Sequence, residues 1–277
     1  MNSRKRREKI YFTLFKLAGV ASVALLIVII ASIASIGIKA IDWQFLTSTR
    51  NGIFPAILGT VYLAIGIAAF SIPTGMFCAI YLNEYAEGGR LVRAVRVAIR
   101  NLAGVPSIVY GLFGLAIFVI FFNLGESLLA AWLTLAAMTL PWTITASEEA
   151  LKSVPDSFRQ ASLALGASKW ETIRKTVLPH AIPGMITGSI IGLARALGET
   201  APLLLVGGVA YMESLPHSPF DQFMALPYHV YYLIMHDSSS TSLARGTGTA
   251  MILIGLVFAV SIGMILIRRH YRKKREW

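Results

Sequence analysis

Six long apolar stretches, separated by shorter polar or basic segments, make up most of this chain. A hydrocarbon core about 30 Å thick needs about 20 apolar residues of helix, and each stretch meets or approaches that length. The stretches run over approximately 12–38, 53–81, 104–122, 128–145, 182–209 and 247–267. The pattern predicts an all-α integral membrane protein with six transmembrane helices and both termini on one side of the membrane.

Composition agrees with this class of protein. The 277 residues are 56% hydrophobic and only 14% charged, which is too apolar for a water-soluble domain. The net charge of +11 could suggest a nucleic-acid partner, but the basic residues lie between apolar stretches and form no nucleic-acid-binding motif. We therefore expect contact with membrane lipid and not with nucleic acid. Cys78 is the only cysteine, so no disulfide can form within the chain.

Lysine and arginine are distributed very unevenly between the loops. Most of the 25 lie near the termini or in the loops that follow the second and fourth stretches, whereas Lys39, Arg50 and Arg245 fall on the opposite side. Basic residues favour the cytoplasmic side. The distribution predicts a multi-pass protein of the cell (inner or cytoplasmic) membrane with both termini in the cytoplasm.

The chain divides into two parts. Residues 1–52 comprise a basic tail, a first transmembrane helix that we expect to be retained, and an external loop. Residues 53–277 form the core, with a cytoplasmic loop at 148–180.

Two further loops are informative. Arginines and aliphatic residues alternate around 90–100, which is typical of an amphipathic helix at the membrane surface, although a simple orientation signal explains them equally well. Residues 210–246 predict a short external helix.

The charges inside the fifth stretch are its most informative feature. Gly184, Gly188 and Gly192 recur every four residues and predict a ridge for close helix packing. Arg195 and Glu199 fall on the same helical face, at a spacing that allows an ion pair. Charged groups at membrane depth are costly and usually mark a pathway. Arginine suits an oxyanion, yet a purely structural ion pair is the alternative.

No metal site is expected. No pair among His217, His229 and His236 has the i, i+4 spacing of a helical site, and no carboxylate stands at ligand spacing beside them, so they are interpreted as ordinary polar surface residues.

The loop before the fifth stretch contains a recognisable pattern. Gln160, Ala161 and Ser162 are followed at fixed spacings by Gly166 and by the pair Leu178 and Pro179. The pattern resembles the EAA loop of ABC importer permeases, with Gln160 in place of the glutamate and Thr176 in place of an isoleucine. An apolar face built from Val154, Phe158, Ala161, Leu165 and Trp170 is expected to bind another protein. The resemblance implies a type I (MetI-like) permease fold whose loop docks on a separate ATPase subunit.

The residues around the buried charges narrow the resemblance. The sequence Gly-Glu-Thr-Ala-Pro at 198–202 resembles the PstA-type permeases of phosphate ABC importers. This implies a channel-forming subunit that pairs with a PstC-like permease, two PstB-like ATP-binding subunits and an external PstS-like phosphate-binding protein. Family knowledge places an arginine and a glutamate on the phosphate path, which match Arg195 and Glu199, with Thr200 beside them.

The chain has no GxxxxGK[ST] phosphate-binding loop, so it is expected to be a non-catalytic subunit without a cofactor. ATP and Mg²⁺ would be bound by the partner ATPase. Three alternatives stay open: a permease for molybdate, sulfate or phosphonate, an intramembrane enzyme that uses Glu199 as general acid or base, and a membrane subunit that senses phosphate.

Overall fold

Long apolar helices form the body of the protein, whose computed structural model describes residues 2–50, 52–86, 88–212, 214–236 and 239–273. Five helical stretches are long and apolar enough to cross a membrane. They cover Arg7–Ala40, Phe54–Tyr85, Leu128–Lys152, Lys169–Ala196 and Thr241–Arg269. The first, second, fourth and sixth predicted spans are therefore confirmed, and the fifth is confirmed in its first half.

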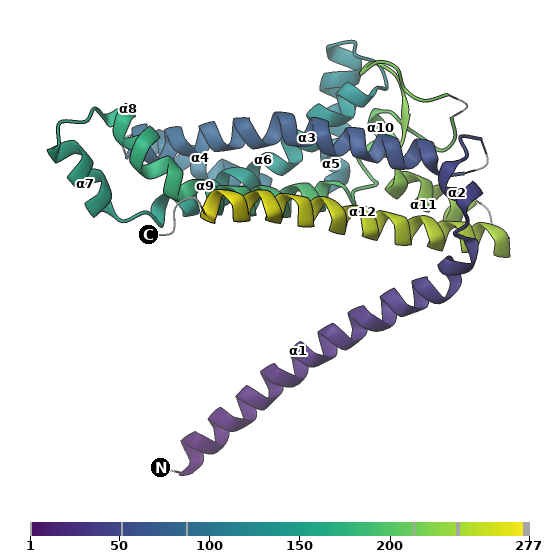
Figure 1. Ribbon diagram of the computed structural model, residues 1–277, viewed down its shortest axis with the longest axis horizontal. Coiled ribbons are helices and arrows are strands. Elements are labelled where there is room, and N and C mark those ends of the chain that lie inside the picture. Colours follow the sequence, from purple (N-terminus) through teal and green to yellow (C-terminus); the bar gives the residue numbers. More distant parts are fainter. Residues whose placement is uncertain (1, 51, 87, 213, 237–238, 274–277) are drawn as a thin grey trace.

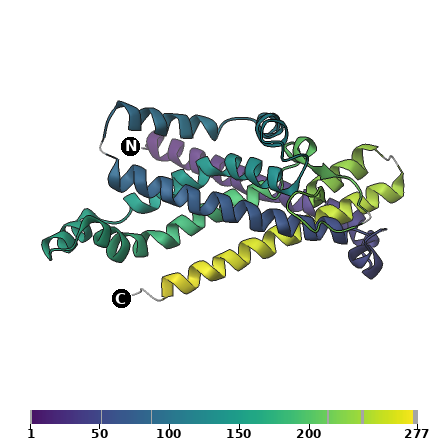
Figure 2. The ribbon, with the colours of Figure 1, turned by 90° about the horizontal axis from the view of Figure 1, so that it is seen from above.

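Four of these helices pack side by side (Figures 1 and 2). They are α3 (Phe54–Ile80), α6 (Leu128–Lys152), α9 (Leu178–Ala196) and α12 (Ser240–Lys273). The core between them is aliphatic and includes Leu63, Ile67 and Leu135, all almost fully buried. Leu193 and Leu197 complete this cluster from the end of α9. Since α6 contacts both α3 and α9 extensively, it is the central helix of the bundle.

The first helix, α1 (Asn2–Gly37), stands apart from the bundle (Figure 1). It contacts α12 only near its end, where the backbone of Gly37 lies against Thr247 and Gly248. No part of its most apolar segment is buried by the rest of the chain. This segment therefore offers its apolar surface to lipid or to another protein.

The structure bends sharply just before the third predicted span. Helix α4 (Arg90–Leu102) is followed by α5 (Ser107–Gly114) and a π-helix (Leu115–Phe121), and the two parts meet at 106°. Pro106, the residue directly before α5, has extended backbone angles. A proline also disfavours helix in the residue before it, so α4 and α5 do not join into one helix. The bend thus lies at residues 103–106, at the start of the predicted span over 104–122, and the helical residues 107–121 fall within that span. It forms a sixth crossing only if the bent pair is counted as one.

Helix α4 is amphipathic, as predicted, but it lies along the bundle (Figure 2). Val92 and Ile99 pack against a cluster that includes Leu151 and Ile144 of α6. A helix lying in the membrane surface would run across the bundle axis, so this orientation does not fit the interfacial interpretation.

The fifth predicted span ends early. Its helix continues from Lys169 through a π-helix (Ile173–Val177) to Ala196, and only the short α10 (Leu203–Val206) follows. Pro202 has no backbone N–H to donate and Gly198 has low helix propensity, so the segment between them does not continue α9. The prediction of one helix over 182–209, with Glu199 inside it, is therefore wrong.

Short elements close the two ends of the bundle. At one end, called the α7 end, lie α7 (Asp156–Ala164), α8 (Lys169–Thr172) and a π-helix (Tyr81–Tyr85). The other end, called the α11 end, holds a 3-10 turn (Ile38–Ala40), α2 (Trp43–Thr47) and α11 (Leu226–His236). Strands β1 (Gly208–Val209) and β2 (Phe223–Met224) form a small parallel pair there, with Gly208 opposite Phe223.

Two predictions concern these ends. The start of α1 and the end of α12 both point toward the side of the α7 end (Figure 1), as expected for an even number of crossings. The short helix expected within 210–246 is α11, which packs along α12 and buries Leu226 and Leu233. His229 on this helix is only 3% exposed, so its interpretation as a surface residue is wrong.

Candidate functional site

The break after α9 brings the charged residues to the edge of the bundle. Arg195 lies in the last turn of α9, and its carbonyl accepts a hydrogen bond from the Gly198 N–H at 3.1 Å. Glu199 lies beyond the helix, and the Thr200 hydroxyl donates to the carbonyl of Pro227 on α11 at 3.4 Å. Non-helical backbone within a membrane protein occurs only where it is buried in protein or lines an aqueous cavity. Such a break is therefore typical of a transport path.

Arg195 has few protein partners. Its Nε lies 3.5 Å from Glu199 Oε1, and the arginine side chain is 48% exposed whereas that of Glu199 is 17% exposed. The guanidinium also lies over the ring of Trp142 on α6, 5.4 Å from the ring centroid. No hydrogen bond joins the guanidinium to a residue within the described ranges. Most of its donors thus remain available for an anion.

Trp142 was missed by the sequence analysis. It comes from a different helix and its distance from Arg195 along the chain gives no periodic signal. The only local indication is a large aromatic residue next to Pro141 inside an apolar stretch.

The glycine row of α9 faces α6. A Cβ atom added at Gly184 would lie 2.8 Å from the Ala150 Cβ, and one added at Gly188 would overlap the Ala146 Cβ. Gly192 is less tightly packed, with Thr143 Oγ1 at 3.7 Å from such an atom. The row therefore sets the close approach of α9, which carries Arg195, and α6, which carries Trp142.

The residues of the EAA-like loop lie together at the α7 end. Gln160, Ala161 and Ser162 are on α7, and Leu178 and Pro179 begin α9. Gly166 has a φ of +83° in the turn between α7 and α8, a conformation that favours glycine. The Ser162 and Thr172 hydroxyls lie 2.9 Å apart and join the two short helices. Helix α8 begins with a capping box of Ser168 and Glu171.

Apolar side chains of α7 and α8 are exposed at this end. Phe158 is 43% exposed, Leu165 89% and Trp170 53%. Ala161 is also exposed, whereas Val154 is 5% exposed and packs under the end of α6. The expected apolar face thus consists of four of the five named residues. The ring of Phe158 also packs against that of His180, with the two ring centroids 5.2 Å apart.

Two arginines that the sequence analysis did not single out fix the α7 end. Arg159 of α7 reaches Glu84, in the π-helix after α3, with Nη2 2.8 Å and Nε 3.3 Å from its carboxylate oxygens. Arg96 of α4 pairs with Glu148 of α6 at 3.1 Å and donates to the Leu82 carbonyl at 2.7 Å. The sequence held two signals for the first of these contacts. Arg159 directly precedes the EAA-like triplet, and Glu84 follows the second apolar stretch.

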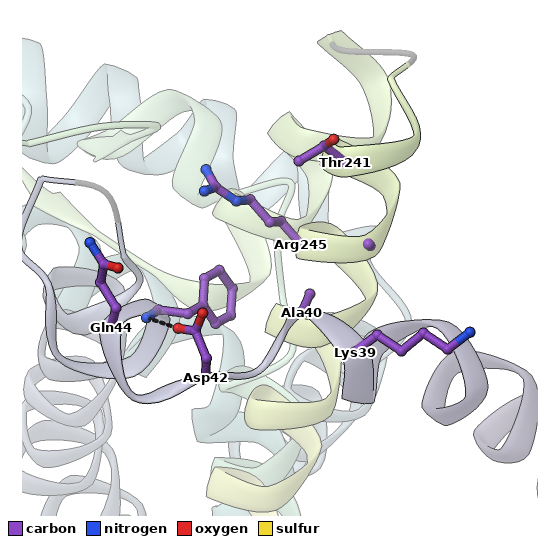
Figure 3. Close-up of a pocket in the computed structure, with 8 residues that line it drawn as sticks. Lys39, Ala40, Asp42, Gln44, Thr241 and Arg245 are labelled. Carbon is purple, nitrogen blue, oxygen red and sulfur yellow. Dashed lines mark hydrogen bonds between the residues drawn. The ribbon is translucent and has the colours of Figure 1, made fainter.

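A polar pocket of about 480 Å³ opens at the α11 end (Figure 3). Asp42 and Gln44 line it from α2 and its cap, and Arg245 lines it from α12. Asp42 caps α2 by accepting from the Phe45 N–H, and Lys39 is directed away from Arg245 (Figure 3). None of the predicted pathway residues lines this pocket. Within the described ranges, no group of His, Cys, Asp and Glu side chains could hold a metal ion.

Known proteins of similar sequence are transport permeases. The chain is 35% identical over 226 residues to the "Phosphate transport system permease protein PstA 1" of Mycobacterium tuberculosis, with 82% of this chain and 72% of the relative covered. It is 32% identical to the "Probable phosphate transport system permease protein PstA" of Methanocaldococcus jannaschii, with 79% and 78% covered.

Solved structures show the same fold. The chain matches the MetNI methionine ABC transporter in an inward-facing conformation with a TM-score of 0.64 at 18% identity, covering 83% of this chain and 99% of that one. It matches a bacterial alginate ABC transporter with a TM-score of 0.69 at 12% identity, covering 96% of each chain. The expected all-α importer permease fold is therefore confirmed. Residues 71–276 match a defined family, and the chain belongs to the binding-protein-dependent transport system inner membrane components.

Proposed function

We propose that this chain is one of two channel-forming permease subunits of an ATP-driven importer of inorganic phosphate. The fold and family support a permease, and the relatives named as phosphate permeases support the substrate. Arg195 carries the proposal. It is a half-exposed arginine in a membrane-spanning helix, held by one loose ion pair and one aromatic ring.

Phosphate passes along Arg195 by exchanging with Glu199. A guanidinium offers a planar set of donors that matches the oxygens of phosphate. At 3.5 Å the contact with Glu199 is longer than the 2.8 Å contact between Arg159 and Glu84. An anion therefore displaces the carboxylate at low cost, and the carboxylate in turn limits how long the anion stays.

The exposed apolar residues of α7 and α8 couple this path to ATP. Phe158, Leu165 and Trp170 present an apolar surface that fits a groove on a separate ATP-binding subunit. In our proposal two PstB-like subunits bind ATP and Mg²⁺, a PstC-like permease completes the channel, and a PstS-like protein delivers phosphate to the α11 end. The α7 end and both termini face the cytoplasm, in agreement with the excess of basic residues there.

Uptake of labelled phosphate by cells that lack their own phosphate uptake tests this proposal. Arg195→Gln should abolish uptake, because the amide is neutral and loses most of the donors, while the variant still assembles in the membrane. The matched control is Arg100→Gln, which makes the same change at an exposed arginine of α4. It should transport like the unmodified protein.

Three results would count against the proposal. Phosphate uptake at the normal rate in Arg195→Gln would reduce the arginine to helix packing. Absence of phosphate uptake by the unmodified complex, together with uptake of sulfate or molybdate, would change the substrate. Failure to copurify with an ATPase would remove the importer function altogether.

A further inference from the structure

The side chain of Arg159 makes more polar contacts than one ion pair requires. Besides the two contacts with Glu84, its Nη1 donates to the Val154 carbonyl at 2.7 Å, and its Nη2 donates to the Leu151 carbonyl at 3.0 Å. A further contact at 3.2 Å reaches Asp156 at the start of α7. One guanidinium therefore joins α7, the last turn of α6 and the segment that follows α3.

The contacts between Arg159 and Glu84 are shielded from water, whereas the Asp156 side chain is exposed. The Glu84 side chain is 7% exposed and that of Arg159 is 18% exposed. The Lys175 and Glu171 pair of α8 and its continuation differs in this respect, since its side chains are 72% and 46% exposed. Exposed pairs contribute little to structure, whereas a buried, bidentate arginine fixes a defined geometry.

The groups outside α7 that accept hydrogen bonds from Arg159 lie at the ends of spanning helices, where a displacement of α7 would reach the bundle. Glu84 lies in the π-helix that continues α3. Leu151 lies in the last turn of α6, the helix that packs against both α3 and α9, and Val154 lies just beyond the end of α6. Arg96 holds the same region from α4, through Leu82 and Glu148. Among the described residues, the other side-chain hydrogen bond that leaves α7 joins Ser162 to Thr172 of α8, and the main apolar side chains of α7 are exposed.

We propose that Arg159 is a positioning residue that transmits the displacement of α7 to the ends of α3 and α6, through its joint contacts with Glu84 and the two carbonyl groups. This inference rests on the proposed function, in which α7 and α8 dock on an ATP-binding subunit. Without Arg159 the docked helices move when ATP is hydrolysed, but the spanning helices that line the path do not follow.

The test uses the complete transporter in proteoliposomes, with ATP hydrolysis and phosphate transport measured on the same sample. Arg159→Gln and Glu84→Gln should keep hydrolysis while phosphate transported per ATP falls about fivefold or more. Arg159→Lys, which keeps the charge but not the fork of donors, should restore part of the ratio. Glu149→Gln is the control, since Glu149 forms an exposed pair with Lys152 and its side chain is 69% exposed.

Amide hydrogen exchange of Asp156–Ala164 in the same complexes gives a readout that does not depend on the substrate. Exchange should become faster in Arg159→Gln, while that of α6 stays unchanged. An unaltered ratio of transport to hydrolysis or unaltered exchange would overturn the inference. If ATP hydrolysis, phosphate transport and the amount of assembled complex all fell together, Arg159 would only stabilise the structure and the inference would also be overturned. No phosphate transport by the unmodified complex would instead overturn the proposed function, and the exchange measurement would still decide the role of Arg159.

Discussion

The guanidinium of Arg195 lies 5.4 Å from the centroid of the Trp142 ring, although the two residues belong to different helices. The ring face attracts the positive charge and restricts the directions in which the arginine can point. Glu199 contacts the same group, with its Oε1 3.5 Å from the arginine Nε. Arginine, ring and carboxylate thus form one unit at the end of α9.

Replacing Trp142 should weaken phosphate binding on the path. Trp142→Leu removes a contact of about 0.5–2 kcal/mol, so we expect the KM for phosphate uptake to rise by up to about thirtyfold. Trp142→Phe keeps an aromatic face, so its KM should lie between that of the unmodified protein and that of Trp142→Leu. Trp43→Leu is the control, because Trp43 is 79% exposed on α2. An unchanged KM in Trp142→Leu would mean that the ring does not orient the arginine.

Glu199 should influence release more than binding. In Glu199→Gln the competing negative charge is lost, so the anion should stay longer on Arg195. We expect a lower KM together with a lower maximal rate of uptake, measured at equal amounts of assembled protein. Glu149→Gln serves again as the control. A higher KM at an unchanged maximal rate would contradict exchange between carboxylate and phosphate.

Sequence patterns predicted the elements whose periodicity is long and regular. The spans around α3, α6 and α12 follow from length and hydropathy alone, and the row of Gly184 and Gly188 from its spacing. The break after Ala196 was missed because the sequence is apolar again after Pro202, so that the mean hydropathy of 182–209 gives no boundary there. The contacts of Arg195 with Trp142 and of Arg159 with Glu84 join distant segments, so only the packed structure reveals them.

The glycine row predicts a strong effect of a small side chain. In Gly188→Ala the new Cβ would overlap that of Ala146, so α6 and α9 must separate at a cost of about 1–3 kcal/mol. We expect a lower thermal unfolding temperature and reduced transport. Gly255→Ala is the matched control, since no atom lies within 4 Å of the added Cβ. Equal stability of the two variants would contradict the close approach.

The turn between α7 and α8 depends on a left-handed residue. At a φ of +83°, Gly166→Ala costs about 1–2 kcal/mol, whereas Gly166→Asn should be better tolerated. We expect the alanine variant to bind the ATP-binding subunit less tightly in a copurification assay, because α7 and α8 lose their relative orientation. Gly88→Ala changes a glycine that has no positive φ and should have no effect. Better binding by alanine than by asparagine would refute the conformational argument.

Acid should destabilise the α11 end through His229. Burial lowers the pKa of His229 below its ordinary value of 6.5, and the nearby Arg245 lowers this pKa further, against the effect of the hydrogen bond to the Ala210 carbonyl. Because the folded pKa is depressed, the unfolded chain takes up the proton first. Stability is therefore complete above pH 6.5 and is lost as the pH falls from there toward the folded pKa.

Thermal unfolding of the detergent-solubilised protein between about pH 8 and pH 5 measures this loss. In His229→Asn the amide can still donate to Ala210 but has no proton to take up, so the decline over this range should be shallower. His217→Asn makes the same change at an exposed histidine and is the matched control. An identical decline in His229→Asn and His217→Asn would assign the acid sensitivity to other groups.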